Sequence, residues 1–167
     1  MWRNSWLWML VVAMTPFNVS FAEIDNLEID FQATAWSSAP DVHIDDSGVR
    51  VTTPSGDPSP FRCGTLSPSD NAYFSERVES MVALMDEDRE RRWGYAGEIS
   101  ESRYVLAIAV SQDDGAMSRY RFVLPPVVNP DPSLWYRGEV PPKPIVELVE
   151  KVLHLSESTL TPCISEP

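Results

Sequence analysis

Residues 103–124 read RYVLAIAVSQDDGAMSRYRFVL, and this stretch decides the fold class. Every residue in the range 104–110 is apolar, so both faces of the expected strand are apolar and the strand should lie inside a sheet. Asp113-Asp114-Gly115 has the composition of a hairpin turn. Large apolar side chains then recur at alternate positions from Tyr120 to Leu124, which predicts the returning strand of a hairpin.

A similar pattern precedes it in the first third of the chain. Apolar residues alternate with polar ones over residues 27–35, which predicts a half-buried strand. Residues 42–44 and 49–51 then mirror each other across Asp45-Asp46-Ser47-Gly48, which predicts a second hairpin. We expect Gly48 to supply the positive φ that the turn requires.

Two helices are predicted from start signals and apolar periodicity. Ser67-Pro68-Ser69-Asp70 combines a capping serine, a first-turn proline and an acidic residue, and an apolar face follows over residues 74–85. The charged residues 86–92 fit either a solvated last turn or a loop. Pro144 opens a second, shorter helix with an apolar stripe over residues 145–153.

These elements predict an α+β fold. The expected architecture is a small antiparallel sheet built from two hairpins, with two helices packed on one of its faces. The length fits a single domain with a sizeable core.

The first 22 residues resemble a secretory signal peptide. Arg3 is followed by an apolar run over residues 6–14, then by Pro16 and by Ser20-Phe21-Ala22. Cleavage after Ala22 would leave a single α+β domain of 145 residues, numbered 23–167. We therefore expect the mature protein in the periplasm or secreted. The absence of a glycosylation sequon after residue 22 favours a bacterial source.

Cys63 and Cys163 are the only cysteines of the chain. An even pair in an oxidising compartment predicts a disulfide, which here would tie the C-terminal tail to the segment before the first helix. The alternative is a redox-active pair, but the C-x-x-C spacing of such pairs is missing.

The chain is acidic. Without Arg3, 12 basic residues stand against 25 acidic ones, a net charge of −13. Nucleic acid is therefore excluded as a likely class of partner, and anionic membrane surfaces are disfavoured. No second apolar segment of membrane length follows the signal peptide, so no membrane insertion is expected after cleavage. Complementary charge favours a protein partner, preferably a basic one, although acidity can also serve solubility alone.

No catalytic, cofactor or metal site is predicted. His43 and His154 are the only histidines, and no motif places a nucleophile or an orienting acid beside either. Zinc-ligand spacing is absent, and the acidic turns at residues 45–48 and 113–115 do not continue as calcium loops. We therefore expect a protein that is not an enzyme.

A Pro-rich loop with seven prolines spans residues 125–144. It contains the adjacent aromatic residues Trp135 and Tyr136, and rigid aromatic side chains on an ordered loop are typical anchors of protein partners. Trp93-Gly94-Tyr95 is a second candidate, so Trp93 and Tyr95 join the candidate partner-binding residues. The alternative for all four side chains is burial against the core.

The layout of residues 66–155 resembles the emfourin-like protease inhibitors, which are small bacterial α+β proteins. The matching features are the helix start at Leu66-Ser67, the apolar residues 78–85, the strand residues 104–110 and the closing helix at 144–153. The chain departs from that family in its signal peptide, its cysteines and its Pro-rich loop. The resemblance implies a small protein that binds another protein.

The sequence thus favours an exported, acidic, non-enzymatic protein-binding domain, with an inhibitor or immunity-type protein that masks a hydrolase as the leading hypothesis. An accessory component of an envelope or secretion assembly is the alternative. A hydrolase would require His43 or His154 to meet a carboxylate and a hydroxyl group in the fold.

Overall fold

The structure is a computed structural model that describes residues 26–34, 39–52, 61–85, 89–97, 102–111, 116–157 and 160–163. The expected signal peptide at residues 1–22 and the expected turn at 113–115 lie outside the described residues. The strands are β1 (Asn26–Thr34), β2 (Val42–Asp45), β3 (Gly48–Thr52), β4 (Phe61–Gly64), β5 (Glu90–Arg92), β6 (Arg103–Ser111), β7 (Met117–Leu124) and β8 (Thr161–Pro162). The helices are α1 (Pro68–Met85) and α2 (Lys143–Ser156), with two short 3-10 turns, η1 (Pro132–Leu134) and η2 (Tyr136–Gly138), between β7 and α2.

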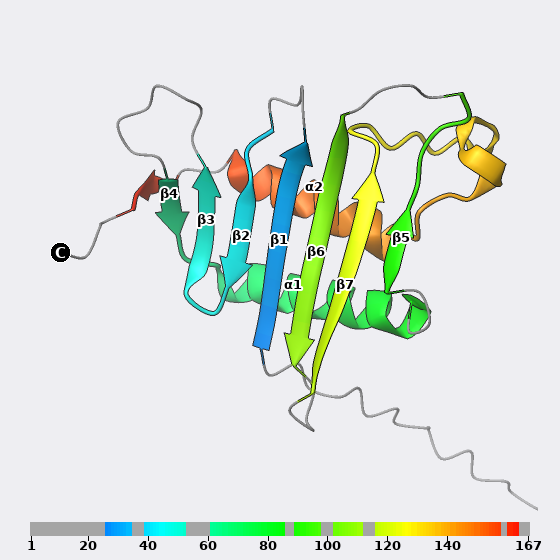
Figure 1. Cartoon of the computed structure of the whole chain (residues 1–167). Coiled ribbons are helices and arrows are strands. Elements are labelled where there is room, and N and C mark those ends of the chain that lie inside the picture. The colour runs from blue at the N-terminus through cyan, green and yellow to red at the C-terminus, as the bar shows by residue number, and fades with distance from the viewer. Residues whose placement is uncertain are drawn as a thin grey trace, which may run out of the picture.

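The strands form a single sheet in the order β5-β7-β6-β1-β2-β3-β4-β8. All neighbours are antiparallel except β5 and β7, which run parallel. The longest ladder joins β1 to β6 over nine residue pairs, so the strand with two apolar faces does lie inside the sheet, as predicted. Both helices lie on the same side of the sheet, behind it in the view of Figure 1.

The α+β class is confirmed, but the small two-hairpin sheet is wrong. The β2–β3 and β6–β7 hairpins form as expected, and Gly48 has φ 129°. The sheet also contains β4, β5 and β8, which have two to four residues each and no apolar alternation. The expectation of a helix turn or a loop is therefore wrong for residues 90–92, which form β5. The two sheet edges are β5 and β8, and short, charged or proline-containing strands are typical of edges, where only one side needs a partner.

The two helices form where the sequence predicts them. The Ser67 hydroxyl accepts a hydrogen bond from the Asp70 backbone N–H at 3.1 Å and donates one to the Asp70 carboxylate at 2.7 Å, which caps α1. The second helix begins at Lys143, so the last two residues of the Pro-rich loop belong to α2. Apolar side chains of both helices pack on one face of the sheet and form the core.

Ion pairs connect the two helices to each other. Lys151 Nζ lies 2.5 Å from an Asp70 carboxylate oxygen, and Arg77 Nε lies 2.9 Å from a Glu147 carboxylate oxygen. Lys151 and the Ser67 hydroxyl together hold the pKa of Asp70 below its usual range. The helix layer is thus joined by polar contacts at its surface as well as by the apolar core beneath it.

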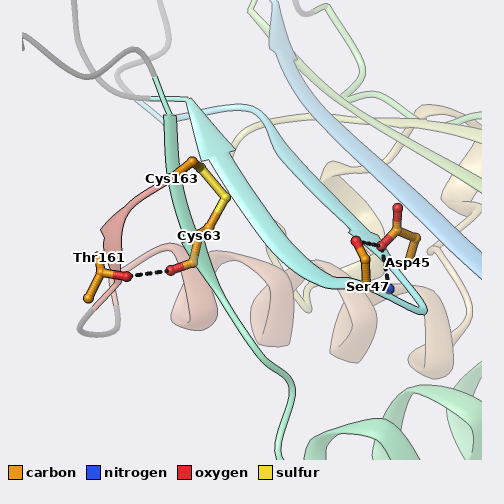
Figure 2. The surroundings of a disulfide bond; sticks show 5 residues. All are labelled: Asp45, Ser47, Cys63, Thr161 and Cys163. Carbon is orange, nitrogen blue, oxygen red and sulfur yellow. Dashed lines mark hydrogen bonds between the residues drawn. A yellow bond between two sulfur atoms is a disulfide. The ribbon is translucent and has the colours of Figure 1, made fainter. Parts of the chain in front are cut away.

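The disulfide predicted between Cys63 and Cys163 is present, with the two Cα atoms 5.0 Å apart. It attaches the tail after α2 to β4 at one edge of the sheet, where the Thr161 hydroxyl also donates to the Cys63 carbonyl at 3.4 Å (Figure 2). Within the described residues, no helix is both long enough and apolar enough to cross a membrane.

Candidate functional site

The Pro-rich loop is fastened to the segment that follows β5. Tyr95 and Trp135 form an isolated antiparallel bridge, flanked by hydrogen bonds from the Ala96 N–H to the Leu134 carbonyl and from the Tyr136 N–H to the Gly94 carbonyl, both 2.9 Å. These contacts join segments about forty residues apart in the chain. In Figure 1 the loop projects beyond β5, at the edge of the sheet opposite the disulfide.

Trp135 lies inside this arrangement and not on its surface. Its side chain is 2% exposed, its ring centroid is 4.8 Å from that of Tyr95, and its Nε1–H donates to the Asn129 carbonyl at 2.5 Å. Trp93 is 3% exposed and packs on Phe122. The interpretation of Trp135 and Trp93 as surface anchors is therefore corrected, because an apolar ring in the core has no area left to offer a partner.

Tyr95 supports the loop from below. It is half-buried, its hydroxyl donates to the Val127 carbonyl, and the same hydroxyl accepts from the Asn129 N–H at 2.8 Å. A single phenol group thus pairs with two backbone groups of the loop. These groups need a side-chain partner because a proline-containing segment cannot form the regular ladder of a sheet. Tyr95 acts as a support of the Pro-rich loop.

The loop also fixes its own backbone. The Asp131 carboxylate accepts from both the backbone N–H and the hydroxyl of Ser133, at 2.9 and 2.7 Å, and these bonds hold the pKa of Asp131 below its usual range. Asn129 in turn accepts from the Asp131 N–H at 2.9 Å. These short-range bonds are those of Asx turns, and they select one conformation of the segment before any partner binds.

Four large apolar side chains of this ordered loop face solvent. They are Val127 at 72% exposure, Tyr136 at 59%, Leu134 at 45% and Val140 at 37%. Elsewhere in the part of the chain that the structure describes, only three large apolar side chains are as exposed. Of these four side chains the sequence predicts only Tyr136 as a candidate, because exposure of an aliphatic residue in a loop has no signal in the sequence.

A cluster of Asp30, His43 and Asp45 lies on the sheet face that the helices do not cover. His43 on β2 is 2.7 Å from Asp30 on β1 through Nδ1, and 3.0 Å from Asp45 through Nε2. The hydrogen bonds to Asp30 and then to Asp45 raise the pKa of His43 above its usual value, despite its partial burial. The Ser47 hydroxyl, with help from His43, holds the pKa of Asp45 below its usual range.

This cluster lacks the order of a hydrolase triad. The Ser47 hydroxyl donates to Asp45 (Figure 2). Among the described residues, the imidazole of His43 bonds to Asp30 and Asp45 and to no hydroxyl or thiol group, so no nucleophile is joined to it. His154 is an exposed residue of α2 and has no such partner among the described residues. The geometry therefore offers no support for the hydrolase hypothesis at either histidine.

The same cluster contains one set of potential metal ligands. Glu28, Asp30 and His43 offer ligand atoms within 4.8 Å of one another, the one such group among the described residues. Both nitrogens of His43 already bond to carboxylates, so a metal ion would have to displace one of these bonds. We interpret the cluster as an ion-pair network that links β1 to β2.

The chain matches no protein-family model, and no curated protein or solved structure is significantly similar to it. The resemblance to emfourin-like inhibitors therefore stays a prediction.

Proposed function

We propose that this chain is an exported, acidic, non-enzymatic protein-binding domain that contacts its partner through the Pro-rich loop. The observation that carries the proposal is the combination of order and exposure in that loop. Its backbone is held by Tyr95, Trp135 and Asp131, while Tyr136 and three aliphatic side chains remain in solvent. A segment that is already ordered loses little conformational entropy on binding, so more of its contact energy is available for affinity.

Within this class we favour an inhibitor or immunity-type protein that masks a hydrolase. A projecting, rigid, apolar loop suits insertion into a cleft, because the cleft can bury its tip while the sheet remains outside. The net charge of −12 for the whole chain supports a basic partner through long-range attraction. Export to the periplasm or the medium, as expected from residues 1–22, would bring the domain to such an enzyme.

The test is capture of the partner by the loop itself. Mature protein, residues 23–167, is immobilised and exposed to envelope extract, in parallel with a variant that carries Leu134→Ser and Tyr136→Ser. The control is Leu84→Ser, which removes an exposed apolar side chain (62%) from α1, away from the loop. We expect one protein to be retained in stoichiometric amount by the wild type and by the control, but not by the loop variant.

The retained protein then decides between the two functional hypotheses. If it is a hydrolase whose activity falls when the mature protein is added, the inhibitor hypothesis is supported. Retention of several structural envelope proteins would instead support the accessory component of an envelope or secretion assembly. Equal retention by the wild type and the loop variant would refute the role of the Pro-rich loop.

A further inference from the structure

The sheet face opposite α1 and α2, here called the uncovered face, differs in charge from the rest of the chain. Its strand residues are those that alternate with the buried ones, and the cross-strand register places them side by side. Among the described strands it carries four carboxylates and five guanidinium groups: Glu28, Asp30, Asp45, Glu90, Arg50, Arg92, Arg103, Arg119 and Arg121. The chain as a whole has a net charge of −12, so its excess acidity lies elsewhere.

Two neighbouring rows across β1, β6 and β7 repeat one pattern. Each row has a carboxylate on β1, an alanine on β6 and an arginine on β7. The rows are Glu28–Ala109–Arg119 and Asp30–Ala107–Arg121. The short alanine side chains leave a hollow of about 360 Å³ along β6, with the acidic residues on one side of it and the basic residues on the other.

The arginines of this hollow have no side-chain partner among the residues that the structure describes. Arg119 and Arg121 are exposed, and among the described residues neither side chain has a hydrogen bond or an ion pair. Two strand spacings of about 4.8 Å separate the β1 side from the β7 side, so the opposite charges of one row face each other across about 10 Å. The basic side is thus open to an external partner. On the acidic side Glu28 is exposed, and Asp30 shares its carboxylate with His43.

We propose that this partner is a second copy of the chain, docked face to face on the uncovered face. A two-fold axis lying along β6, in the plane between the two sheets, exchanges the β1 side with the β7 side and leaves each row at its own height. Glu28 of one copy then meets Arg119 of the second copy, and Asp30 meets Arg121. By symmetry the interface contains each pair twice, which is the self-complementarity that a two-fold interface requires.

A third pair of residues obeys the same operation. Glu90 on β5 extends the Asp30 row at one end, next to Arg121, and His43 on β2 extends it at the other, next to Asp30. They lie at equal strand distances from Ala107, so the two-fold axis brings Glu90 of one copy opposite His43 of the second. Both ring nitrogens of His43 already bond to Asp30 and Asp45, so this position adds no ion pair to the interface. On β6 the same axis places Arg103 of one copy opposite Arg103 of the second, so the attraction across the interface rests on the Glu28–Arg119 and Asp30–Arg121 pairs, each formed twice.

The packing geometry of two sheets is compatible with this arrangement. Sheets that stack face to face lie about 10 Å apart with strands crossing at about 30°, so the axis is tilted by about 15° from β6. The tilt offsets the two partners of a row at β1 and β7 by about 2–3 Å along the strands, a distance that long side chains can span. Ala107 and Ala109 allow that approach along the axis, because they are short. The long side chains of β1 and β7 then reach across the interface on both sides. The dimer is independent of the proposed function, because the contacts of the Pro-rich loop do not enter the argument.

The test is a charge-reversal mixing experiment on the mature chain, residues 23–167. One variant carries Arg119→Glu and Arg121→Glu, and the other carries Glu28→Arg and Asp30→Arg. We expect wild type to sediment as a dimer, and each variant alone to sediment as a monomer with its dimer dissociation constant raised by at least about a hundredfold. An equimolar mixture should restore the dimer mass, because every pair across the mixed interface is again of opposite charge.

The matched control reverses two exposed basic residues off the uncovered face, Arg137→Glu with Lys143→Glu, and should remain a dimer. Circular dichroism verifies that each variant is folded. If one double variant does not fold, two single variants, Glu28→Arg and Arg119→Glu in separate chains, replace the double variants in the mixing experiment. A wild type that remains monomeric at about 1 mM, where association is worth about 4 kcal/mol, overturns the proposal. So does a mixture that remains monomeric, or a dimer that survives charge reversal.

Discussion

The adjacent residues Trp135 and Tyr136 should respond to alanine substitution in opposite ways. Trp135 is 2% exposed and Tyr136 is 59% exposed, although the sequence presents them as one aromatic pair. A tryptophan buries about 200 Å², which at about 25 cal/mol per Å² gives about 5 kcal/mol. Core substitutions of this kind typically cost about 3–5 kcal/mol. We therefore expect Trp135→Ala to lower the free energy of unfolding by about 3–5 kcal/mol.

The hydrogen bond of the indole ring can be separated from its packing. Trp135→Phe keeps most of the apolar contact with Tyr95 but leaves the Asn129 carbonyl without its donor. We expect a loss of about 1 kcal/mol for this variant, because the carbonyl is partly buried and loses the net worth of one hydrogen bond. Tyr136→Ala should change the free energy of unfolding by about 0.5–1 kcal/mol at most, the worth of its exposed stacking with Arg137.

The assay is urea denaturation of the oxidised mature protein, followed by far-ultraviolet circular dichroism because the substitutions alter tryptophan fluorescence. Equal slopes of free energy against urea concentration are required before the midpoints are compared. In the partner-capture assay the ranking should reverse, with Tyr136→Ala losing binding while the protein remains folded. A loss below about 1 kcal/mol for Trp135→Ala would refute the burial argument, since no core tryptophan costs so little.

Three further predictions concern the disulfide, the histidine cluster and the first helix. Replacement of Cys63 and Cys163 by alanine should lower the free energy of unfolding by up to about 4.7 kcal/mol in the chain-entropy model, because the bond closes a loop of 100 residues. Denaturation with and without reductant measures this loss, and equal midpoints would contradict the structure. The pKa of His43 is raised in the fold, so the stability that His43 contributes is complete below pH 6.5 and is lost as the pH rises through the pKa of the folded state. The pKa of Asp45 is lowered, so the stability that Asp45 contributes is lost only as the pH falls below about 3.8. Wild type should therefore exceed His43→Asn in stability by more at pH 6 than at pH 9, and a difference that is constant with pH would refute the ion-pair network. Ser67→Ala should cost about 1 kcal/mol through loss of the helix cap, and thermal unfolding that is unchanged would show that the cap contributes nothing.

The candidate site was predicted in part. The Pro-rich loop was recognised because prolines exclude regular structure, and the cysteine pair because an even number of thiols in an exported chain predicts a bond. The His43 cluster was missed as a cluster. Asp30 and His43 are thirteen residues apart, and only the β1–β2 register makes them neighbours. A histidine and an aspartate at polar positions of two predicted strands were a signal, but the register was not known.

The sequence by itself determined the elements whose patterns are local. The central hairpin followed from the apolar run over residues 104–110 and the alternation over residues 120–124. The first turn followed from Gly48, and the start of α1 from Ser67 with Pro68, because each depends on the conformational preferences of a few adjacent residues. Only the tertiary structure decided which strands are neighbours, that β4, β5 and β8 complete the sheet, and that Trp135 is buried while Tyr136 is exposed. It also decided the charge pattern of the uncovered face. These properties depend on contacts between segments that are distant in the sequence. The energies of such contacts add up over the whole fold, so no short stretch of the chain predicts them.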